Sequence, residues 1–181
     1  MPKPYFEDKS SVESIIRVNH AGEHGAQCIY KGQIKYAKND HQKKVFQEML
    51  SQEMEHLEYF ESLIKFGYAK PTLFLPIWSV LGNFAGVISQ KMGYKYSMIV
   101  TEAVEEVIVD HYQKQIEYLA KHAPNSELLS KIRKFQQDEA DHIEIATATQ
   151  DASNDNIIVD SSLKKIVSTF CHIAILLSKR L

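Results

Sequence analysis

The sequence is poor in cysteine, glycine and proline and carries little net charge. These shortages limit the classes of protein to which it can belong. Its two cysteines, Cys28 and Cys171, stand far apart in 181 residues, which predicts a reducing intracellular setting and excludes a rubredoxin-type or iron–sulfur module. A net charge of only −2 gives no indication of a nucleic-acid partner. With 44% hydrophobic residues, we expect one folded domain over residues 1–181, without a signal peptide in the polar segment Met1 to Ser11.

Glycine and proline gather between Gly67 and Gly93, and this region divides two helix-rich halves. No alternating strand pattern rivals the helical periodicity on either side of it. The first expected helix runs from Ser10, with Glu13 in a capping box, to about Asn39, and the second from about Asp40 to Phe66, with Gly67 as the stop. The third runs from after Gly93 to before Pro124, and the fourth from a cap at Asn125 or Ser126 to about Gln150. A polar loop over Asp151 to Asp160 then precedes a C-terminal amphipathic helix of about 160–181.

Four glutamates and two histidines form an ordered series along these helices. The series consists of Glu23; Glu53 with His56; Glu105; and Glu139 with His142. Each member takes the place of a core residue on an apolar stripe at helical spacing. A single Glu-x-x-His is weak evidence, because about one is expected by chance. Two copies on interior stripes, each preceded by an isolated glutamate, match the ligand pattern of di-metal carboxylate sites in ferritin-like bundles.

The spacing of the series predicts how the chain is connected. Thirty residues separate Glu23 from Glu53, and thirty-four separate Glu105 from Glu139. Two helical hairpins therefore meet around a pseudo-twofold axis, and the segment of about 67–93 is the long crossover between them. We predict an all-α, ferritin-like four-helix bundle with one long crossover, to which a crossover helix and a C-terminal helix are added.

The chemistry of the six side chains indicates a pair of divalent cations. Residues three apart share one face of a helix, so each Glu-x-x-His converges on one ion. Four buried carboxylates without counterions would repel one another and would carry a large desolvation cost. Two divalent cations cancel that charge. Mixed carboxylate and imidazole ligands favour iron or manganese, and the sequence leaves zinc open.

The crossover contains an uncharged stretch of 20 residues, Pro71 to Gln90. Its length would suit a membrane span, but its prolines, glycines and Asn83 dilute its hydrophobicity. The interpretation we favour is an interfacial helix with Trp78 at the lipid headgroups and Lys70 and Lys91 at its ends; a helix packed flat on the bundle is the other alternative. The C-terminal helix has an apolar stripe that either completes the core or extends this surface. Together the two segments predict a lipophilic substrate that enters from a bilayer.

Several segments of the chain resemble one family of enzymes. They are RVNHAGEHGA (17–26), QEMEHLEYF (52–60), PTLFLPIWSVLG (71–82), EAVEEVIVDHY (102–112), DEADHIEIA (138–146) and the closing SKRL. This combination resembles the demethoxyubiquinone hydroxylases of ubiquinone biosynthesis and covers roughly Ser14 to Leu181. A bare di-iron bundle would share the glutamates and histidines but not the RVNHAGE or LPIWSVLG strings.

The resemblance implies a peripheral membrane enzyme that uses two iron ions and O2 to hydroxylate the ring of a polyprenyl benzoquinol. The iron ligands that it implies are Glu23, Glu53, His56, Glu105, Glu139 and His142, with Glu53 and Glu139 as bridges. His111 and Tyr112 match residues that assist proton and electron delivery. NADH is the candidate electron donor, and other ubiquinone-biosynthesis proteins are candidate partners. The implied location is the cytoplasmic face of a cell membrane, or the inner mitochondrial membrane in a eukaryote.

Two positions depart from the family pattern. His24 stands where relatives often have tyrosine, and we expect it to lie outside the ligand set. His172 stands where many relatives have arginine, which leaves the electron donor less defined.

Two other functions compete with the one that the resemblance implies. They are a di-iron ferroxidase or peroxide-scavenging protein, and a membrane-associated quinone-binding protein whose metal is structural.

Overall fold

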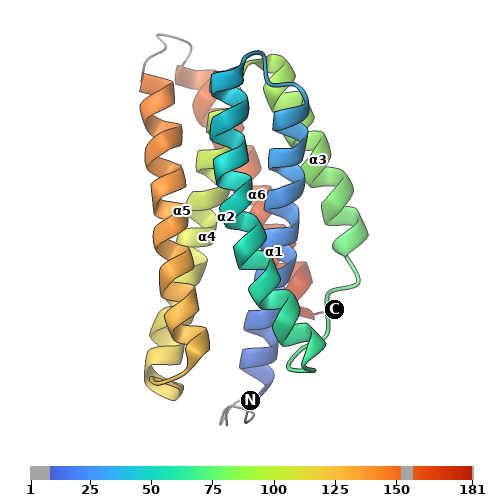
Figure 1. Ribbon diagram of the computed structural model, residues 1–181, viewed down its shortest axis with the longest axis vertical. Helices are drawn as coiled ribbons and strands as arrows, with labels where there is room; N and C mark the ends of the chain where they lie inside the picture. Colours follow the sequence, from blue (N-terminus) through green and yellow to red (C-terminus); the bar gives the residue numbers. More distant parts are fainter. Residues whose placement is uncertain (1–8, 152–156, 181) are drawn as a thin grey trace.

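Six helices run side by side along the long axis of the protein in the computed structural model, which describes residues 9–151 and 157–180 (Figure 1). The helices are α1 (Lys9–Lys35), α2 (Asp40–Lys65), α3 (Leu75–Met92), α4 (Tyr94–His122), α5 (Glu127–Asp151) and α6 (Ile157–Arg180). No strand occurs within these two described ranges. The predicted all-α class is therefore confirmed.

Most of the helix boundaries agree with the local sequence signals. The Asn39 side chain accepts a hydrogen bond from the backbone of Gln42 at 2.9 Å and so caps α2. Gly67 follows the end of α2 with φ +78°, a conformation in which glycine is favoured. The Ser126 hydroxyl accepts from the backbone of Leu129 at 3.3 Å, so Ser126 rather than Asn125 caps α5.

Three boundary predictions were wrong. Helix α1 ends at Lys35 rather than near Asn39, because the extended backbone of Asn39, with φ −155°, belongs to the cap of the next helix. Helix α1 begins at Lys9, so Ser10 lies inside its first turn and does not open a capping box. Helix α6 begins at Ile157, before the expected end of the polar loop; residues 152–156 of that loop lie outside the described residues.

The four helices of the central bundle form two antiparallel pairs, α1 with α2 and α4 with α5 (Figure 1). Because α2 and α4 run in the same direction, the chain must return along the whole bundle between them. Helix α3, drawn in green, makes that return along the outside of α1, and α6 covers α4 and α1. The predicted long crossover is therefore present.

The crossover helix packs flat against the bundle with its backbone in contact with α1. A Cβ atom added to Gly86 would lie 2.0 Å from the carbonyl oxygen of Ile29, and one added to Gly32 would lie 2.6 Å from the carbonyl oxygen of Asn83. Only glycine allows this approach. None of the helices in the described ranges combines the length and apolar character that crossing a bilayer requires.

Trp78 does not lie where the interfacial interpretation placed it. Its side chain is 7% exposed, and its indole Nε1 donates a hydrogen bond to the Ser178 hydroxyl at 3.0 Å. A buried indole that ties α3 to α6 is not free to lie among lipid headgroups. The prediction for Trp78 was wrong, because a helical period alone does not tell which face meets a neighbouring helix.

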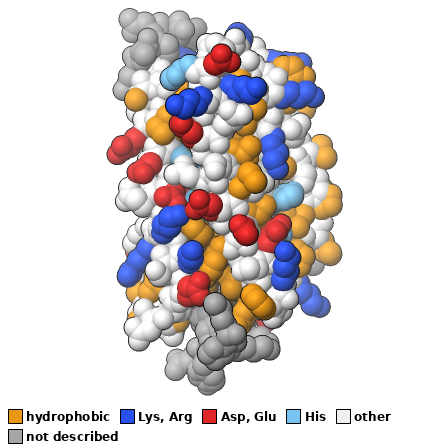
Figure 2. All heavy atoms as spheres, viewed as in Figure 1, with side chains coloured by type: hydrophobic (Ala, Val, Ile, Leu, Met, Phe, Trp, Pro, Cys, Tyr) orange, Lys and Arg blue, Asp and Glu red, His pale blue; other side chains and the backbone are white. Residues whose placement is uncertain are grey.

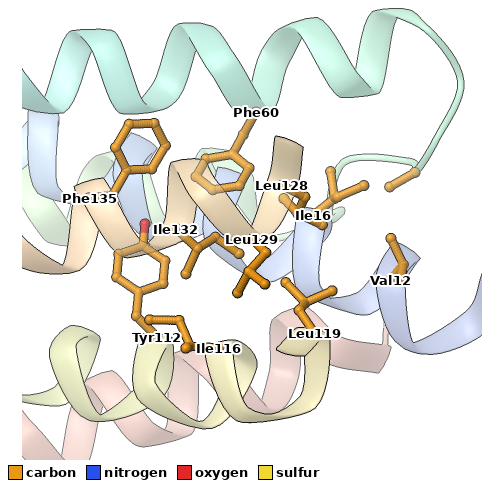
Figure 3. Packing of buried hydrophobic residues seen from close by; sticks show 11 residues of the cluster. Val12, Ile16, Phe60, Tyr112, Ile116, Leu119, Leu128, Leu129, Ile132 and Phe135 are labelled. Carbon is orange, nitrogen blue, oxygen red and sulfur yellow. The ribbon is translucent and has the colours of Figure 1, made fainter. Parts of the chain in front are cut away.

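Two apolar clusters fill the bundle, one toward each end. One holds Tyr30, Phe46, Met49, Met98 and other residues. The other, shown in Figure 3, holds Ile16, Phe60, Leu119, Ile132, Phe135 and their neighbours, with Tyr112 at its edge. On each of the four bundle helices, the glutamates and histidines of the series fall between residues of the first cluster and residues of the second. The fold therefore places a polar layer between the two apolar clusters.

Candidate metal centre

The six side chains of the series converge in the middle of the bundle. None of them is more than 3% exposed. They form two groups: Glu23, Glu53, His56 and Glu139; and Glu53, Glu105, Glu139 and His142. Within each group, one potential ligand atom from every residue lies within 4.8 Å of the others. Glu53 and Glu139 belong to both groups, as expected for carboxylates that bridge two ions.

The two shared carboxylates turn one oxygen toward each histidine. Glu139 Oε1 lies 3.1 Å from Nδ1 of His56, while its Oε2 lies 2.9 Å from Nδ1 of His142. Glu53 Oε2 lies 4.0 Å from Nδ1 of His56, and its Oε1 lies 3.5 Å from Nδ1 of His142. This geometry would offer each of two ions one oxygen from each shared carboxylate and one imidazole nitrogen.

Six of the atoms that face the centre have no hydrogen-bond partner among the described residues. They are both carboxylate oxygens of Glu53, both of Glu139, and Nδ1 of His56 and of His142. Buried polar atoms are rarely left without partners, because an unsatisfied one costs about 1–3 kcal/mol. Six such atoms in one layer, all of types that bind transition metals, fit a pair of divalent cations.

Nε2 of each histidine contacts a side chain on the helix that carries the other Glu-x-x-His motif. In both cases that side chain belongs to the residue directly before the glutamate of the motif. His56 Nε2 lies 3.0 Å from Oδ2 of Asp138, which comes before Glu139. His142 Nε2 lies 2.7 Å from Oε1 of Gln52, which comes before Glu53. Such contacts fix the ring so that Nδ1 points at the centre, as is usual for histidines that bind metals.

A tyrosine hydroxyl supports each of the two unshared glutamates. Tyr112 of α4 donates to Oε1 of Glu23 on α1. Tyr30 of α1 donates to Oε1 of Glu105 on α4, at 2.8 Å. The sequence had singled out Tyr112, and the structure brings it into contact with the cluster.

The charges in this layer strongly perturb one another. Burial and the neighbouring charge of Glu139 raise the pKa values of Glu53 and Glu105 well above the usual carboxyl range. Burial also acts on Glu139, but the adjacent imidazoles of His142 and His56 outweigh it and lower the pKa of Glu139 to about 2. Burial opposes protonation of His56, yet Glu139 and Glu23 raise its pKa to about 11. Without cations, Glu53 and Glu105 therefore resist ionisation in this layer.

An apolar cavity of about 460 Å³ reaches the cluster from one side. It lies between α1, α3, α4 and α6, and Glu23, Tyr112 and His111 lie in its wall. Toward the outside its wall includes Leu81, Phe84, Ile166 and Phe170, which are also exposed at the surface. A ligand that is mostly apolar can therefore extend from the outer face of α3 and α6 to the carboxylate of Glu23.

His111, the second residue predicted to assist the reaction, lies in the wall between this cavity and a smaller polar pocket that includes Lys114 and Lys179. Its Nε2 is buried without a hydrogen-bond partner in the described part of the chain. Burial, and then the charges of Lys179 and Lys114, lower the pKa of His111 to about 4. His111 is therefore neutral at pH 7. The structure places it beside the cavity and away from the two ligand groups.

The two departures from the family pattern lie outside the cluster. His24 points toward α3, where its Nε2 lies 2.6 Å from the hydroxyl of Ser79, so the expectation that it is no ligand agrees with its position. His172 is exposed, and its Nδ1 lies 2.8 Å from the carbonyl oxygen of Ser168 one turn earlier on α6.

Three contributors to the centre were missed in the sequence: Gln52, Asp138 and Tyr30. Each left a signal in the repeat itself. Gln52 and Asp138 both stand directly before the glutamate of a Glu-x-x-His, and a tyrosine stands seven residues after each isolated glutamate, at Tyr30 and Tyr112. Aligning the two halves of the chain on their glutamates would have found all three.

A four-helix bundle with one long crossover, and with this carboxylate and imidazole layer at its centre, defines the ferritin-like class of di-metal carboxylate proteins. Within that class, the family model described as "Ubiquinone biosynthesis protein COQ7" matches residues 10–178. The chain belongs to this family.

Similar proteins are known from both eukaryotes and bacteria. The NADPH-dependent 3-demethoxyubiquinone 3-hydroxylase, mitochondrial, of Homo sapiens is 38% identical over 175 residues, which cover 96% of this chain and 79% of the human protein. The protein of the same name from Dictyostelium discoideum is 43% identical over 135 residues, covering 74% and 62%. The 3-demethoxyubiquinol 3-hydroxylase of Rhodospirillum rubrum is 36% identical over 138 residues, covering 76% and 64%.

Proposed function

We propose that this protein hydroxylates the ring of a polyprenylated demethoxy-benzoquinol with O2, as a step of ubiquinone biosynthesis. The observation that carries the proposal is the contact between the buried Glu and His layer and an apolar cavity, in a chain whose relatives are named for this hydroxylation. A layer without the cavity would serve iron storage equally well. A cavity without the layer would bind quinols without oxidising them.

The six converging residues would hold two iron ions, with Glu53 and Glu139 as the bridges. Two divalent cations would balance the four carboxylates and satisfy the unpartnered oxygens of the bridges. When bound, the ions supply the redox chemistry that splits O2, which the protein side chains cannot perform. The chain's own residues fix the geometry: Asp138 and Gln52 orient the two imidazoles, and Tyr112 orients Glu23.

The quinol ring would lie at the inner end of the cavity, beside Glu23 and Tyr112. A volume of about 460 Å³ is in the usual range for small-molecule sites and suits a substituted ring with the first part of its tail. The almost wholly apolar wall excludes water from the reacting ring. His111, neutral at pH 7, can accept a hydrogen bond from a ring hydroxyl on the side of the polar pocket.

The isoprenoid tail would leave the cavity between α3 and α6 and enter a membrane surface. The exposed apolar residues on this side are Leu73, Ile77, Val80, Leu81, Phe84, Ile88 and Met92 on or just before α3, and Ile166, Phe170, Ile173, Leu176 and Leu177 on α6. Figure 2 shows hydrophobic side chains gathered along the edge of the molecule where α3 lies, with lysine or arginine near both ends of that edge. Such a surface suits peripheral binding to anionic lipid. Several relatives are named as mitochondrial, so the membrane would be the inner mitochondrial membrane in a eukaryote and the cytoplasmic face of the cell membrane in a bacterium.

Each turnover needs two electrons and two protons, because one atom of O2 enters the ring and the other leaves as water. The sequence has no G-x-G-x-x-G fingerprint for a nicotinamide cofactor. The names of the eukaryotic relatives specify NADPH and that of the Rhodospirillum rubrum relative specifies no donor, whereas the family resemblance had suggested NADH. We propose a reduced nicotinamide as the donor, and a helper protein of the same pathway as the candidate partner.

The proposal is tested with Glu53→Ala, compared with Glu58→Ala on the exposed face of the same helix. Glu53→Ala should lose bound iron and hydroxylation of a demethoxyquinol, measured by metal analysis and by product detection; Glu58→Ala should keep both. A Glu53→Ala protein with full iron content and activity would reject the proposal. Wild-type protein that oxidises Fe²⁺ without any need for quinol would support the ferroxidase alternative instead.

The membrane part is tested separately by flotation with vesicles that contain anionic lipid. Replacing Val80 and Phe84 by serine should release the protein from the vesicles, because these side chains are 68% and 62% exposed on α3. Replacing Met54 and Ile145, exposed on α2 and α5, should change nothing. Equal release by both pairs would reject the assigned surface.

A further inference from the structure

The two halves of the bundle support their unshared glutamates in a reciprocal way. Glu23 and Tyr30 are seven residues apart on α1, as are Glu105 and Tyr112 on α4. Each tyrosine crosses to the other helix: Tyr112 donates to Glu23 and Tyr30 donates to Glu105. Seven residues are about two turns, so the hydroxyl of each tyrosine lies beside the glutamate of its antiparallel partner.

The surroundings of the two pairs are not alike. The wall of the apolar cavity includes both Glu23 and Tyr112, but of the described residues neither Glu105 nor Tyr30 belongs to it. Tyr30 is 1% exposed and packs in the cluster with Phe46, Met49 and Met98, with its ring edge-on to His142 at 6.1 Å between centroids. The Glu105 side of the layer is therefore closed, and the Glu23 side faces the cavity.

The hydrogen bond from Tyr30 restricts how Glu105 can turn. With Oε1 held by the hydroxyl at 2.8 Å, the second oxygen remains for an ion in the group formed with Glu53, Glu139 and His142. The Tyr30 ring is itself buried among the side chains of its cluster, which restricts the movement of its hydroxyl and so of the Glu105 carboxylate. The Tyr112–Glu23 pair, which borders a cavity that a substrate must enter and leave, lacks such packing on its cavity side.

We propose that Tyr30 is a positioning residue that fixes Glu105 as the ligand of the closed ion position, the one shared with His142. This assignment rests on the proposed function only in requiring that the layer binds two ions. Tyr30 touches neither the cavity nor the reacting ring, so it acts through Glu105. The two ion positions thereby differ: one is held by a locked glutamate, and the other faces the substrate.

The test is Tyr30→Phe, which keeps the ring and removes only the hydroxyl. Its matched control is Tyr94→Phe, because Tyr94 packs edge-on to Phe46 in the same cluster at 5.6 Å and directs its hydroxyl to Thr149 instead of a glutamate. Metal-free protein is titrated with Co²⁺ or Mn²⁺ and followed by absorption or paramagnetic resonance. Tyr30→Phe should weaken binding of one ion of the pair by about 10–100-fold and leave the other unchanged, as is typical when an outer support of a ligand is lost. Tyr94→Phe should bind both ions as the wild type does.

Double variants separate positioning from a general effect on packing. In a Glu23→Ala background, Tyr30→Phe should still weaken the remaining ion by the same factor. In a Glu105→Ala background it should have no further effect, because the group through which it acts is gone. Equal losses in both backgrounds, or wild-type titration of Tyr30→Phe alone, would overturn the assignment while leaving the proposed function intact. Wild-type protein that binds no pair of ions would overturn both.

Discussion

Nε2 of His56 lies 3.0 Å from Oδ2 of Asp138, so a carboxylate on α5 holds the imidazole of α2 with its other nitrogen toward the buried layer. Asp138 directly precedes Glu139, whose Oε1 lies 3.1 Å from that other nitrogen. One turn of α5 therefore supplies both a carboxylate shared by the two candidate ligand groups and the support for the histidine opposite it. The same relation holds between Gln52 and His142 in the other half, with a neutral amide in place of the charge.

The first prediction concerns this support. Asp138→Ala should weaken binding of the ion next to His56 by about 10–100-fold, because the ring loses the contact that orients it. Metal titration of the metal-free protein measures the effect. Asp141→Ala, an exposed position one turn further on α5, is the control and should bind both ions normally. Unchanged affinity in Asp138→Ala would show that packing alone orients the imidazole.

The second prediction concerns removal of the metal. Each ion that binds only the folded protein should stabilise it by about 2.7 kcal/mol at one hundred times its dissociation constant. For a chain of 181 residues each bound ion should therefore raise Tm by about 5–10 °C, and chelation should reverse the rise. Thermal unfolding with and without Mn²⁺ measures it. Glu53→Ala should show no shift with the ion, and a shift of wild-type size in that variant would place the ions elsewhere.

The third prediction concerns the contact between α1 and α3. Gly86→Ala should destabilise the protein by about 1–3 kcal/mol, because the new Cβ atom would overlap the backbone at Ile29. Gly25→Ala is a control in the same pair of helices: no described atom outside its own neighbourhood lies within 4 Å of that Cβ, and alanine favours a helix over glycine. Gly25→Ala should therefore be neutral or stabilising by up to about 1 kcal/mol in urea unfolding. Equal stability of the two variants would contradict the close contact.

The fourth prediction concerns pH. The pKa of His111 is lowered to about 4 by burial and by Lys179 and Lys114, whereas the unfolded chain has the ordinary value of about 6.5. Between these values the unfolded state binds the extra proton, so the stability that neutral His111 supplies above pH 6.5 is lost as the pH falls toward 4, by at most about 3 kcal/mol. Urea unfolding of metal-free protein at several pH values should show this slope.

The matched variants for that slope are His111→Gln and His41→Gln. His111→Gln should flatten the fall in stability between pH 6.5 and 4, since the titrating group is gone. His41 is exposed, and His41→Gln should leave the slope as it is. The burial argument fails if His111→Gln unfolds with the same pH dependence as the wild type.

The helices and the buried layer were largely predictable, because both follow from local periodicity. A glutamate such as Glu53, in the middle of an apolar stripe, must point inward wherever that helix packs. Asn39, Gly67 and Ser126 act on the backbone within a few residues, so their caps could be predicted as well. Trp78 was misplaced because the crossover is apolar all round, and nothing local distinguishes the side that meets α1 and α6.

The sequence by itself determined which residues are helical, which six polar side chains lie inside, and which family the chain resembles, since these depend on spacing along one chain. Only the tertiary structure decided that the hydroxyl of Tyr30 meets Glu105 and that of Tyr112 meets Glu23. It also decided that Trp78 is buried, and that the apolar cavity opens at Glu23 and not at Glu105. Those features depend on the register and distance between helices. Both are set by backbone contacts such as that of Gly86 with Ile29, which join residues far apart in the sequence.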